Sequence, residues 1–120
     1  MKALIDTNIL VDYLQGVPQA RLELERYRRP AISVITWMEV MVGATAETAA
    51  ATRSFLDGFE LLGIDVATAD QAVQLRRSRR IKLPDAIIWA TALCSSCLLV
   101  TRNTRDMDAG DPGVRVPYTV

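Results

Sequence analysis

The sequence contains no histidine among its 120 residues, and this absence excludes several kinds of catalysis. Without imidazole the chain has no Ser-His-Asp or Cys-His nucleophile pair, and no histidine acid or base of the kind that many metal-free ribonucleases use. A zinc site with nitrogen ligands is excluded as well. Any chemistry must therefore use carboxylates, hydroxyls, lysine, arginine or thiols.

Cysteine is scarce too, because its only two copies are Cys94 and Cys97, in a C-x-x-C pattern. A zinc site would need two further soft or nitrogen ligands, which the chain lacks. A thioredoxin-like motif opens a helix, whereas this one closes an expected helix. We therefore expect buried or partly buried structural thiols that stay reduced.

Long apolar runs are missing. The longest nearly uncharged apolar stretch, residues 86–100, falls short of the ~20 residues that a membrane-spanning helix needs. Asp6 and Asp12 would interrupt the hydrophobic core of a signal peptide. Half of the residues are apolar. We expect a soluble cytoplasmic protein with no membrane association, folded as a single domain over residues 1–120.

Short apolar runs alternate with helical patterns along the chain. Strands are expected at residues 1–5, 31–35 and 98–101, with weaker ones at 61–64 and 114–116. Helices are expected at 8–14, 19–29, 36–42, 44–56, 68–77 and 83–94. This alternation predicts an α/β fold with a central, mostly parallel β-sheet flanked by α-helices.

Four acids stand at conspicuous places in this pattern. Asp6 directly follows the first strand, and Asp106 lies in the loop after strand 98–101. Glu39 lies inside an apolar helix, and Asp85 heads a buried one. Loops at the carboxyl ends of parallel strands share one crevice, and the first turns of the following helices, where we place Glu39 and Asp85, reach the same side. The four carboxylates are therefore expected to meet.

Carboxylates gathered in one crevice repel one another unless they are protonated or bound to a cation. Hard divalent ions such as Mg²⁺ or Mn²⁺ prefer oxygen ligands and usually keep several waters. Such a site can activate water for attack on a phosphodiester without any histidine.

Each acid also has a purely structural interpretation. Asp6 and Asp85 could cap helices. Glu39 could lie on a partly exposed helix face. Asp106 belongs to a turn-rich loop, where aspartate is common.

Four segments carry a resemblance to a known family. They read LIDTNIL at 4–10, SVITWMEV at 33–40 followed by Gly43, LPDAIIWATA at 83–92, and LVTRNTRD at 99–106. In this order the segments resemble the PIN-domain ribonucleases, and most closely the VapC-type toxins of type II toxin–antitoxin systems. They span nearly the whole chain.

The resemblance implies a PIN-like fold and a metal-dependent endoribonuclease that binds Mg²⁺ or Mn²⁺. Asp6, Glu39 and Asp85 match the family's three core acids, with Asp6 and Asp85 as the principal metal ligands. Some members carry the fourth acid at the position of Asn103 and others at that of Asp106. We assign Asp106 as the fourth catalytic carboxylate, and Asn103 as its polar partner or a water-mediated ligand.

The same resemblance assigns the remaining roles. Glu39 and Asp106 would orient metal-bound waters or a second ion, and cleavage by water would leave a 5′-phosphate and a 3′-hydroxyl. Thr7, Asn8 and Thr101 could hydrogen-bond the phosphate or the carboxylates. Met107 departs from the family, which usually has an aromatic residue there, and this should affect packing more than chemistry.

The formal net charge is zero, from 14 basic and 14 acidic residues, but the charge is unevenly distributed. Five basic residues lie within seven positions just before Asp85: Arg76, Arg77, Arg79, Arg80 and Lys82. We predict that this cluster guides an RNA backbone toward the acids. The alternative is the solvated end of a helix.

Partners follow from the resemblance as well: a cognate VapB-type antitoxin and a second copy of the toxin in a homodimer. Candidate interface residues are Trp37, Met38, Met41 and Phe55, although core packing explains them equally well. Two other functions stay open. One is a Mg²⁺-dependent phosphatase with Asp6 as its nucleophile, although such enzymes have a second aspartate where this chain has Asn8. The other is a non-catalytic RNA-binding module.

Overall fold

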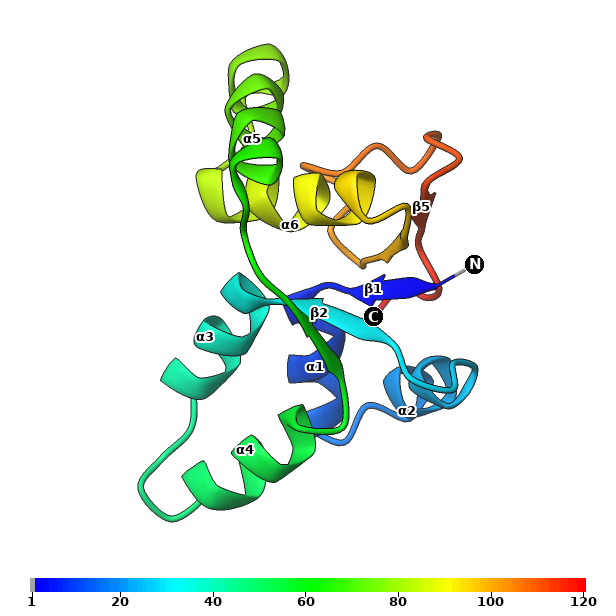
Figure 1. Ribbon diagram of the computed structural model, residues 1–120. Helices are drawn as coiled ribbons and strands as arrows, with labels where there is room; N and C mark the ends of the chain where they lie inside the picture. Colours follow the sequence, from blue (N-terminus) through cyan, green and yellow to red (C-terminus); the bar gives the residue numbers. More distant parts are fainter. Residues whose placement is uncertain (1) are drawn as a thin grey trace.

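The predicted strands form one sheet at the centre of the molecule (Figure 1). The computed structural model describes residues 2–120, so Met1, part of the first predicted strand, lies outside the described residues. The strands are β1 (Ala3–Ile5), β2 (Ala31–Ser33), β3 (Glu60–Leu62), β4 (Leu98–Val100) and β5 (Val114–Arg115). Their order is β3-β2-β1-β4-β5, and all neighbouring pairs are parallel.

Helices cover both faces of this sheet. They are α1 (Thr7–Leu14), α2 (Pro18–Glu25), α3 (Val34–Val42), α4 (Ala49–Leu56), α5 (Val66–Arg79) and α6 (Leu83–Cys94). The first four lie on one side of the sheet, and α5 and α6 lie on the other (Figure 1). The predicted α/β fold with a parallel sheet is confirmed.

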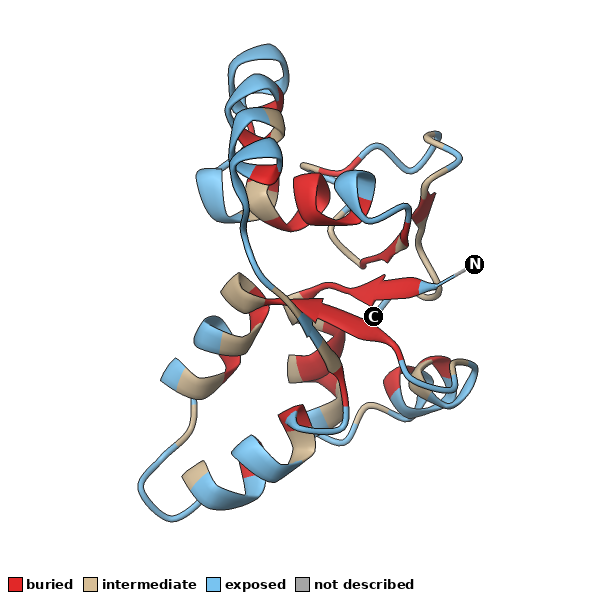
Figure 2. Ribbon diagram, viewed as in Figure 1, coloured by how far each residue is buried: buried red, intermediate tan, exposed pale blue. Residues whose placement is uncertain are grey.

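The central strands β1 and β2 are buried on both faces (Figure 2), whereas the edge strand β3 is partly exposed. Successive side chains of a strand point to opposite faces. Leu4 accordingly joins the apolar core beneath α5 and α6, whereas Ala3 and Ile5 join the core on the side of α1 and α3. Burial on both sides explains why these segments read as continuous apolar runs rather than alternating ones.

Five of the six helix starts differ from the prediction, by one or two residues in α1, α2, α3 and α5 and by five residues in α4. Ser33 caps α3 by accepting a hydrogen bond from the backbone N of Ile35 at 3.1 Å, so β2 ends there and α3 begins at Val34 rather than at residue 36. Helix α4 begins at Ala49 rather than at residue 44. The preceding residues form a turn in which the Thr45 backbone N donates to Thr48 Oγ1 at 2.8 Å.

The two thiols are free, and they differ in environment. Cys97 is buried, and burial raises the pKa of its thiol. Cys94, at the end of α6, is exposed, so the expectation that both thiols are at least partly buried was wrong for Cys94. Within residues 2–120, no helix is both long enough and apolar enough to span a bilayer.

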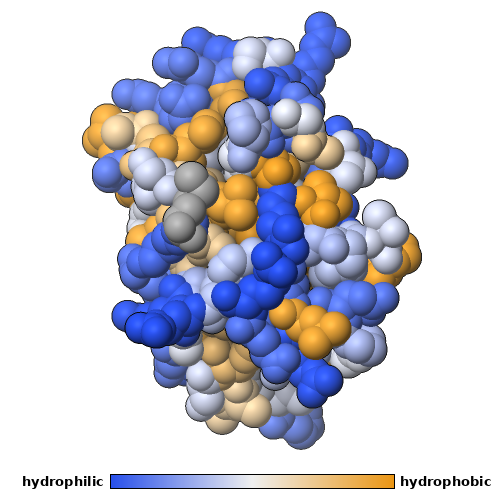
Figure 3. Space-filling model, turned by 90° about the vertical axis from the view of Figure 1, so that its right-hand side faces the viewer, coloured by the Kyte–Doolittle hydropathy of each residue, from blue (hydrophilic) through white to orange (hydrophobic). Residues whose placement is uncertain are grey.

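The candidate interface residues lie mainly in the core. Trp37, Met41 and Phe55 are partly buried against the cluster beneath α1 and α3, and Phe55 stacks on Tyr13 with 4.9 Å between ring centroids. Met38 is 45% exposed. On the molecular face that carries β5, apolar and hydrophilic side chains are intermixed (Figure 3). Core packing thus accounts for three of the four residues.

Candidate active site

Asp6 lies where β1 ends and α1 begins. Its backbone N donates to the carbonyl of Val100 in β4 at 2.9 Å, which fixes the end of β1 beside β4. Its carboxylate caps α1, because Oδ1 accepts from the Thr7 backbone N at 2.7 Å. The capping interpretation is therefore correct, but it occupies only one of the two carboxylate oxygens.

The other oxygen of Asp6 is held by side chains. Asp6 Oδ2 accepts from Thr101 Oγ1 at 2.7 Å and from Asn8 Nδ2 at 3.2 Å. The side chain is 2% exposed. Burial raises the pKa of Asp6, these hydrogen bonds oppose the rise, and the charge of Glu39 adds to it. Both oxygens of the buried Asp6 carboxylate, which can only accept hydrogen bonds, are thus held by donors from α1 and from the residue that follows β4.

Asn8 and Thr101 connect α1 to the loop that follows β4. Asn8 Nδ2 lies 3.3 Å from Thr101 Oγ1, and Asn8 Oδ1 accepts from the Arg102 backbone N at 3.1 Å. Thr101 Oγ1 also accepts from the Asn103 backbone N at 2.9 Å. The predicted supporting residues therefore form one continuous network around Asp6.

Glu39 reaches this network through Thr7. Thr7 Oγ1 lies 2.7 Å from Glu39 Oε1 and 2.9 Å from Thr36 Oγ1. A hydroxyl has one proton and a carboxylate can only accept, so Thr7 donates to Glu39. Because α3 begins at Val34, Glu39 lies in the second turn and not, as predicted, in the first. The residue is exposed, in keeping with its structural alternative, yet it is tied to the neighbour of Asp6.

Asp85 lies in the first turn of α6. Its pKa is raised from 3.8 to about 6, first by burial, then by the charges of Asp6 and Asp106, by a side-chain hydrogen bond with Asp106, and by the charge of Glu39. The charges of Asp6, Glu39 and Asp106 thus all raise the pKa of Asp85, and the charge of Glu39 also raises the pKa of Asp6. Burial is the largest cause of both shifts, and repulsion among the carboxylates adds to it.

Asp106 is the fourth member of this group, and Asn103 holds it. Asn103 Nδ2 donates to Asp106 Oδ2 at 3.1 Å, and the Asp106 backbone N donates to Asn103 Oδ1 at 3.3 Å. The charge of Asp106 raises the pKa of Asp85. Asn103 instead holds Asp106 through these two hydrogen bonds. Met107 is 1% exposed and packs beneath this loop.

The donor set suits a hard divalent cation. Among residues 2–120 no three acidic or sulfur side chains are close enough to form a closed metal cage. Mg²⁺ does not need one, because it is usually bound through one or two carboxylates and keeps several waters. Burial is the largest cause of the raised pKa of Asp85, and the charges of Asp6, Asp106 and Glu39, which a cation would neutralise, add to it. Asp6 and Asp85 therefore fit Mg²⁺ or Mn²⁺.

The predicted basic cluster surrounds the end of α5. Arg76, Arg77 and Arg79 lie in its last turn, where positive charge complements the helix dipole. Arg80 ends the helix in a left-handed conformation with φ 54°, which glycine usually occupies. Lys82 precedes α6 at its N-cap. All five side chains are exposed, so the solvated-end interpretation describes part of the cluster correctly.

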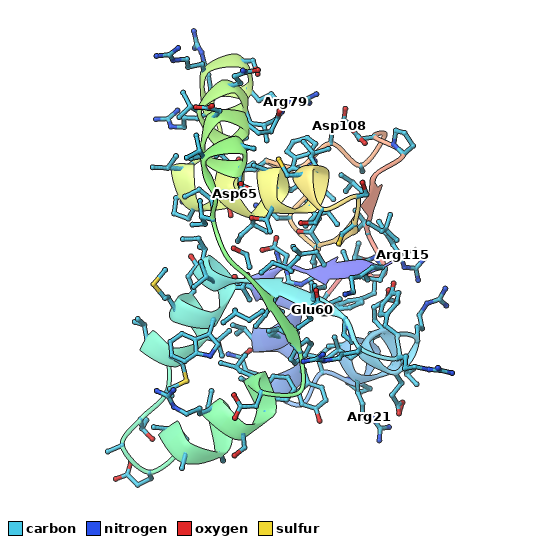
Figure 4. The ribbon with its side chains drawn as sticks, viewed as in Figure 1. Arg21, Glu60, Asp65, Arg79, Asp108 and Arg115 are labelled. Carbon is cyan, nitrogen blue, oxygen red and sulfur yellow. The ribbon has the colours of Figure 1, made fainter. Side chains whose placement is uncertain are left out.

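Arg79 is anchored in the fold. Its guanidinium lies 4.8 Å from the centroid of the Trp89 ring and 4.0 Å from Asp108 Oδ2, toward which it points (Figure 4). Beside it lies a polar surface pocket of about 370 Å³, lined by Arg79, Arg80, Ile81, Thr104, Arg105, Asp106, Met107 and Asp108. Arg105, which the sequence had not singled out, thus joins the basic cluster next to an acid of the site.

Two buried ion pairs were not predicted. Asp12 of α1 pairs with Arg102, and Glu23 of α2 pairs with Arg115 of β5. Asp12 gives a signal in the sequence, because it interrupts the apolar face of α1, but its partner lies 90 residues away. Neither Arg102 nor Arg115 differs from a surface arginine in its local sequence.

Comparisons with known proteins agree with this geometry. Residues 3–110 match the family model described as PIN domain. A structure described as a toxin–antitoxin complex from Klebsiella pneumoniae is 47% identical, with TM-score 0.93, covering 99% of this chain and 100% of that one. DNA-bound VapBC from Salmonella typhimurium is 27% identical, with TM-score 0.79 and 96% of each chain covered. FitAcB from Neisseria gonorrhoeae is 25% identical, with TM-score 0.81, covering 96% of this chain and 97% of that one. Among curated proteins, none matches this chain.

Proposed function

Because this chain belongs to the PIN-domain family, we propose that it is a metal-dependent endoribonuclease and the toxin of a toxin–antitoxin pair. The observation that carries the proposal is that the charges of Asp6, Glu39 and Asp106 all act on Asp85, because this places four carboxylates together at the carboxyl ends of parallel strands. The similar Klebsiella structure, which covers nearly the whole chain, supports the toxin assignment.

Asp6 and Asp85 would hold Mg²⁺ or Mn²⁺, with Glu39 and Asp106 beside them. When bound, the cation would supply Lewis acidity and lower the pKa of water, so that a nucleophile forms at neutral pH without histidine. The protein's own contribution is orientation. Thr101 fixes one oxygen of Asp6, Thr7 holds Glu39, and Asn103 holds Asp106.

The substrate would approach along the basic cluster. The pocket beside Asp106 presents Arg80 and Arg105, whereas Arg79 is already stacked on Trp89. Arginine binds phosphate oxygens with its planar fork of donors, so this pocket suits the RNA backbone next to the acids. The zero net charge of the chain does not oppose this path, because screening limits the reach of distant charges to about 8 Å at physiological salt.

The partners we propose are a VapB-type antitoxin and a second copy of this chain. The similar structures were solved as toxin–antitoxin complexes, some of them on DNA, which supports the first partner. Exposed apolar side chains on α3, Met38 at 45% and Val42 at 85%, are available for an interface. We place the activity in the cytoplasm, where an RNA substrate is accessible.

The phosphatase alternative finds no support at position 8. A phosphatase of that kind would need a second carboxylate there, and the amide of Asn8 is instead engaged by Asp6, Thr101 and Arg102. A non-catalytic RNA-binding module would bind RNA without cutting it, so the same experiment distinguishes it.

The test is cleavage of RNA by the purified full-length chain with Mg²⁺ or Mn²⁺ and with EDTA. We expect metal-dependent cleavage that leaves 5′-phosphate ends, and its loss in Asp6→Asn and Asp85→Asn proteins with unchanged circular dichroism. Full activity of a pure Asp85→Asn protein would refute the proposal. RNA binding without cleavage in Mn²⁺ would favour the binding module, and phosphate release from a small phosphoester would favour the phosphatase.

A further inference from the structure

An ion pair with a buried carboxylate joins Asp12 of α1 to Arg102 in the loop that follows β4. Arg102 Nε donates to Asp12 Oδ2 at 2.7 Å, and Arg102 Nη2 donates to Asp12 Oδ1 at 2.9 Å. The Tyr118 hydroxyl donates to Asp12 Oδ2 at 2.8 Å. Asp12 is 4% exposed. This bidentate geometry, which fixes direction as well as distance, joins α1 to the loop after β4.

Arg102 stands between the two residues that hold acids of the site. Its neighbour Thr101 donates to Asp6, and its neighbour Asn103 donates to Asp106. The backbone N of Arg102 itself donates to Asn8 Oδ1. Any rotation of this segment would therefore shift the donors of Asp6 and Asp106 together.

Asp12 stands on the same helix as Asp6. Asp6 caps α1, and Asp12 follows Asn8 by four residues, on the same helix face. The helix is thus bound to the loop at two successive turns, through Asn8 and through Asp12. Two contacts one turn apart fix the angle between helix and loop, which one contact cannot do.

From this geometry we propose that the Asp12–Arg102 pair is a positioning element of the active site, which sets the placement of Asp106 relative to Asp6. Neither residue has a hydrogen bond to any of the four acids, so the effect passes through Asn8, Thr101 and Asn103. The inference rests on the proposed function for its catalytic consequence, but the placement also governs cation binding.

The chain contains a second pair of the same chemistry. Arg115 Nε and Nη2 donate to Glu23 at 2.7 and 2.9 Å, and the Tyr27 hydroxyl donates to Glu23 Oε2 at 2.6 Å. Glu23 is also 4% exposed. The Arg115 side chain extends from β5 to α2 (Figure 4). The backbone carbonyl of Arg115 accepts from the Thr101 backbone N at 3.0 Å. A substitution of the Arg115 side chain that leaves the strand undistorted retains this bond.

These two pairs make matched variants possible. Lysine keeps the charge of arginine but cannot form the bidentate fork, so Arg102→Lys and Arg115→Lys remove the same geometry at two places. Both should lower the melting temperature to a similar extent. If the Asp12–Arg102 pair has only a structural role, the two variants should lose the same activity for each degree by which the melting temperature falls. If it has a positioning role, Arg102→Lys should lose more activity than Arg115→Lys.

The experiment compares the full-length wild-type, Arg102→Lys and Arg115→Lys proteins. Mn²⁺ affinity is measured by electron paramagnetic resonance of the free ion, and kcat and KM by RNA cleavage. We expect Arg102→Lys to weaken Mn²⁺ binding by about 10-fold and to lower kcat by about 10–100-fold, the range for partners that orient metal ligands. KM should change by less than about 3-fold, because the basic pocket is untouched. Arg115→Lys should change none of these quantities by more than about 2-fold.

Equal changes in both variants, or no change in Arg102→Lys, would overturn the inference. If an arginine variant fails to fold, Tyr118→Phe and Tyr27→Phe each remove one hydroxyl from one pair and decide the question at smaller amplitude. A wild-type chain that binds Mn²⁺ without cutting RNA contradicts the proposed function alone, and the Mn²⁺ comparison still decides the positioning role. A wild-type chain that does not bind Mn²⁺ contradicts both.

Discussion

The hydroxyl of Thr101 donates a 2.7 Å hydrogen bond to Asp6 Oδ2, although the two residues are 95 positions apart. Thr101 Oγ1 in turn accepts from the Asn103 backbone N at 2.9 Å, so Thr101 links the first strand to the loop that carries Asp106. A single buried threonine thereby connects the placement of two acids.

Replacing Thr101 with valine removes this link at nearly constant volume. We expect Thr101→Val to lower RNA cleavage by about 10–100-fold, because the orientation of Asp6 is lost. The matched control is Thr91→Val, since Thr91 is buried on α6 and donates only to the Ile87 carbonyl. Rate measurements at saturating RNA would contradict this role if both variants lost the same fraction of activity.

Removing the charge of Asp85 should stabilise the metal-free protein. The pKa of Asp85 is about 6, above its ordinary value of 3.8, so the folded state holds the proton more tightly than the unfolded state does. The resulting stability is lost as the pH rises from about 4 through 6. At pH 7.5 in EDTA, we expect Asp85→Asn to melt about 4 °C higher than wild type, which corresponds to about 1 kcal/mol. Added Mg²⁺ should raise the wild-type melting temperature and leave that of the variant unchanged. A lower melting temperature for the variant in EDTA would show that the charge of Asp85 does not destabilise the metal-free fold.

Two aspartates of one loop should differ in importance. Asp106 acts on Asp85, whereas Asp108 faces Arg79 and accepts from the Gly110 backbone N. We expect Asp106→Asn to reduce kcat by at least about 10-fold, and Asp108→Asn to change it by less than about 2-fold. The opposite ranking in steady-state kinetics would assign the fourth acid elsewhere in the loop.

The salt dependence of RNA binding should identify the path of the backbone. Each phosphate contact to single-stranded nucleic acid contributes about 0.7 to the slope of log K against log salt. Arg80→Ala/Arg105→Ala, which empties the pocket beside Asp106 of two charges, should therefore reduce the slope by about 1.4 in filter-binding titrations. Arg28→Ala/Arg29→Ala removes two exposed charges just before β2 and serves as the control, with an unchanged slope expected. Equal slopes for the two double variants would show that the basic cluster does not lie on the RNA path.

Acid should weaken the fold through the two buried ion pairs. Burial alone would raise the pKa of Asp12, but hydrogen bonds from Arg102 and Tyr118 outweigh it and hold that pKa below 3.8. Arg115 and Tyr27 likewise outweigh burial and lower the pKa of Glu23 below 4.5. The folded state then binds fewer protons than the unfolded state, so stability present above about pH 4.5 is lost as the pH falls further. Urea unfolding at pH 5 and pH 3 should show this loss, and Asp12→Asn should show less of it. An identical loss in the variant would mean that other carboxylates are responsible.

The sequence was sufficient to predict the order and type of the elements. Apolar runs of three to five residues before Asp6, around Ile32 and before Thr101 are typical of buried strands, and the helices expected between them favoured parallel connections. Those connections in turn predicted that Asp6, Asp85 and Asp106 would meet at one edge of the sheet. The first turn assigned to Glu39 was wrong because the capping role of Ser33 was not anticipated.

Other features of the site could not be predicted from the local sequence pattern. Asp12 and Glu23 are recognisable as acids within helices, but their partners Arg102 and Arg115 follow 90 and 92 residues later. Long-range pairs of this kind depend on strand order and on where each chain segment crosses a helix. Periodicity and propensity carry no such information. The Asp12–Arg102 pair, which we infer positions the site, was therefore visible only in three dimensions.

The central place of β1 in the sheet also governs when the acids can assemble. β1 leaves the ribosome before its neighbour β4, and Thr101 follows Asp6 by 95 residues. At about 5–20 residues per second, the acidic cluster stays incomplete for on the order of 10 s of translation. A nascent chain therefore carries Asp6 without its partners until Thr101 and Asp106 have been synthesised.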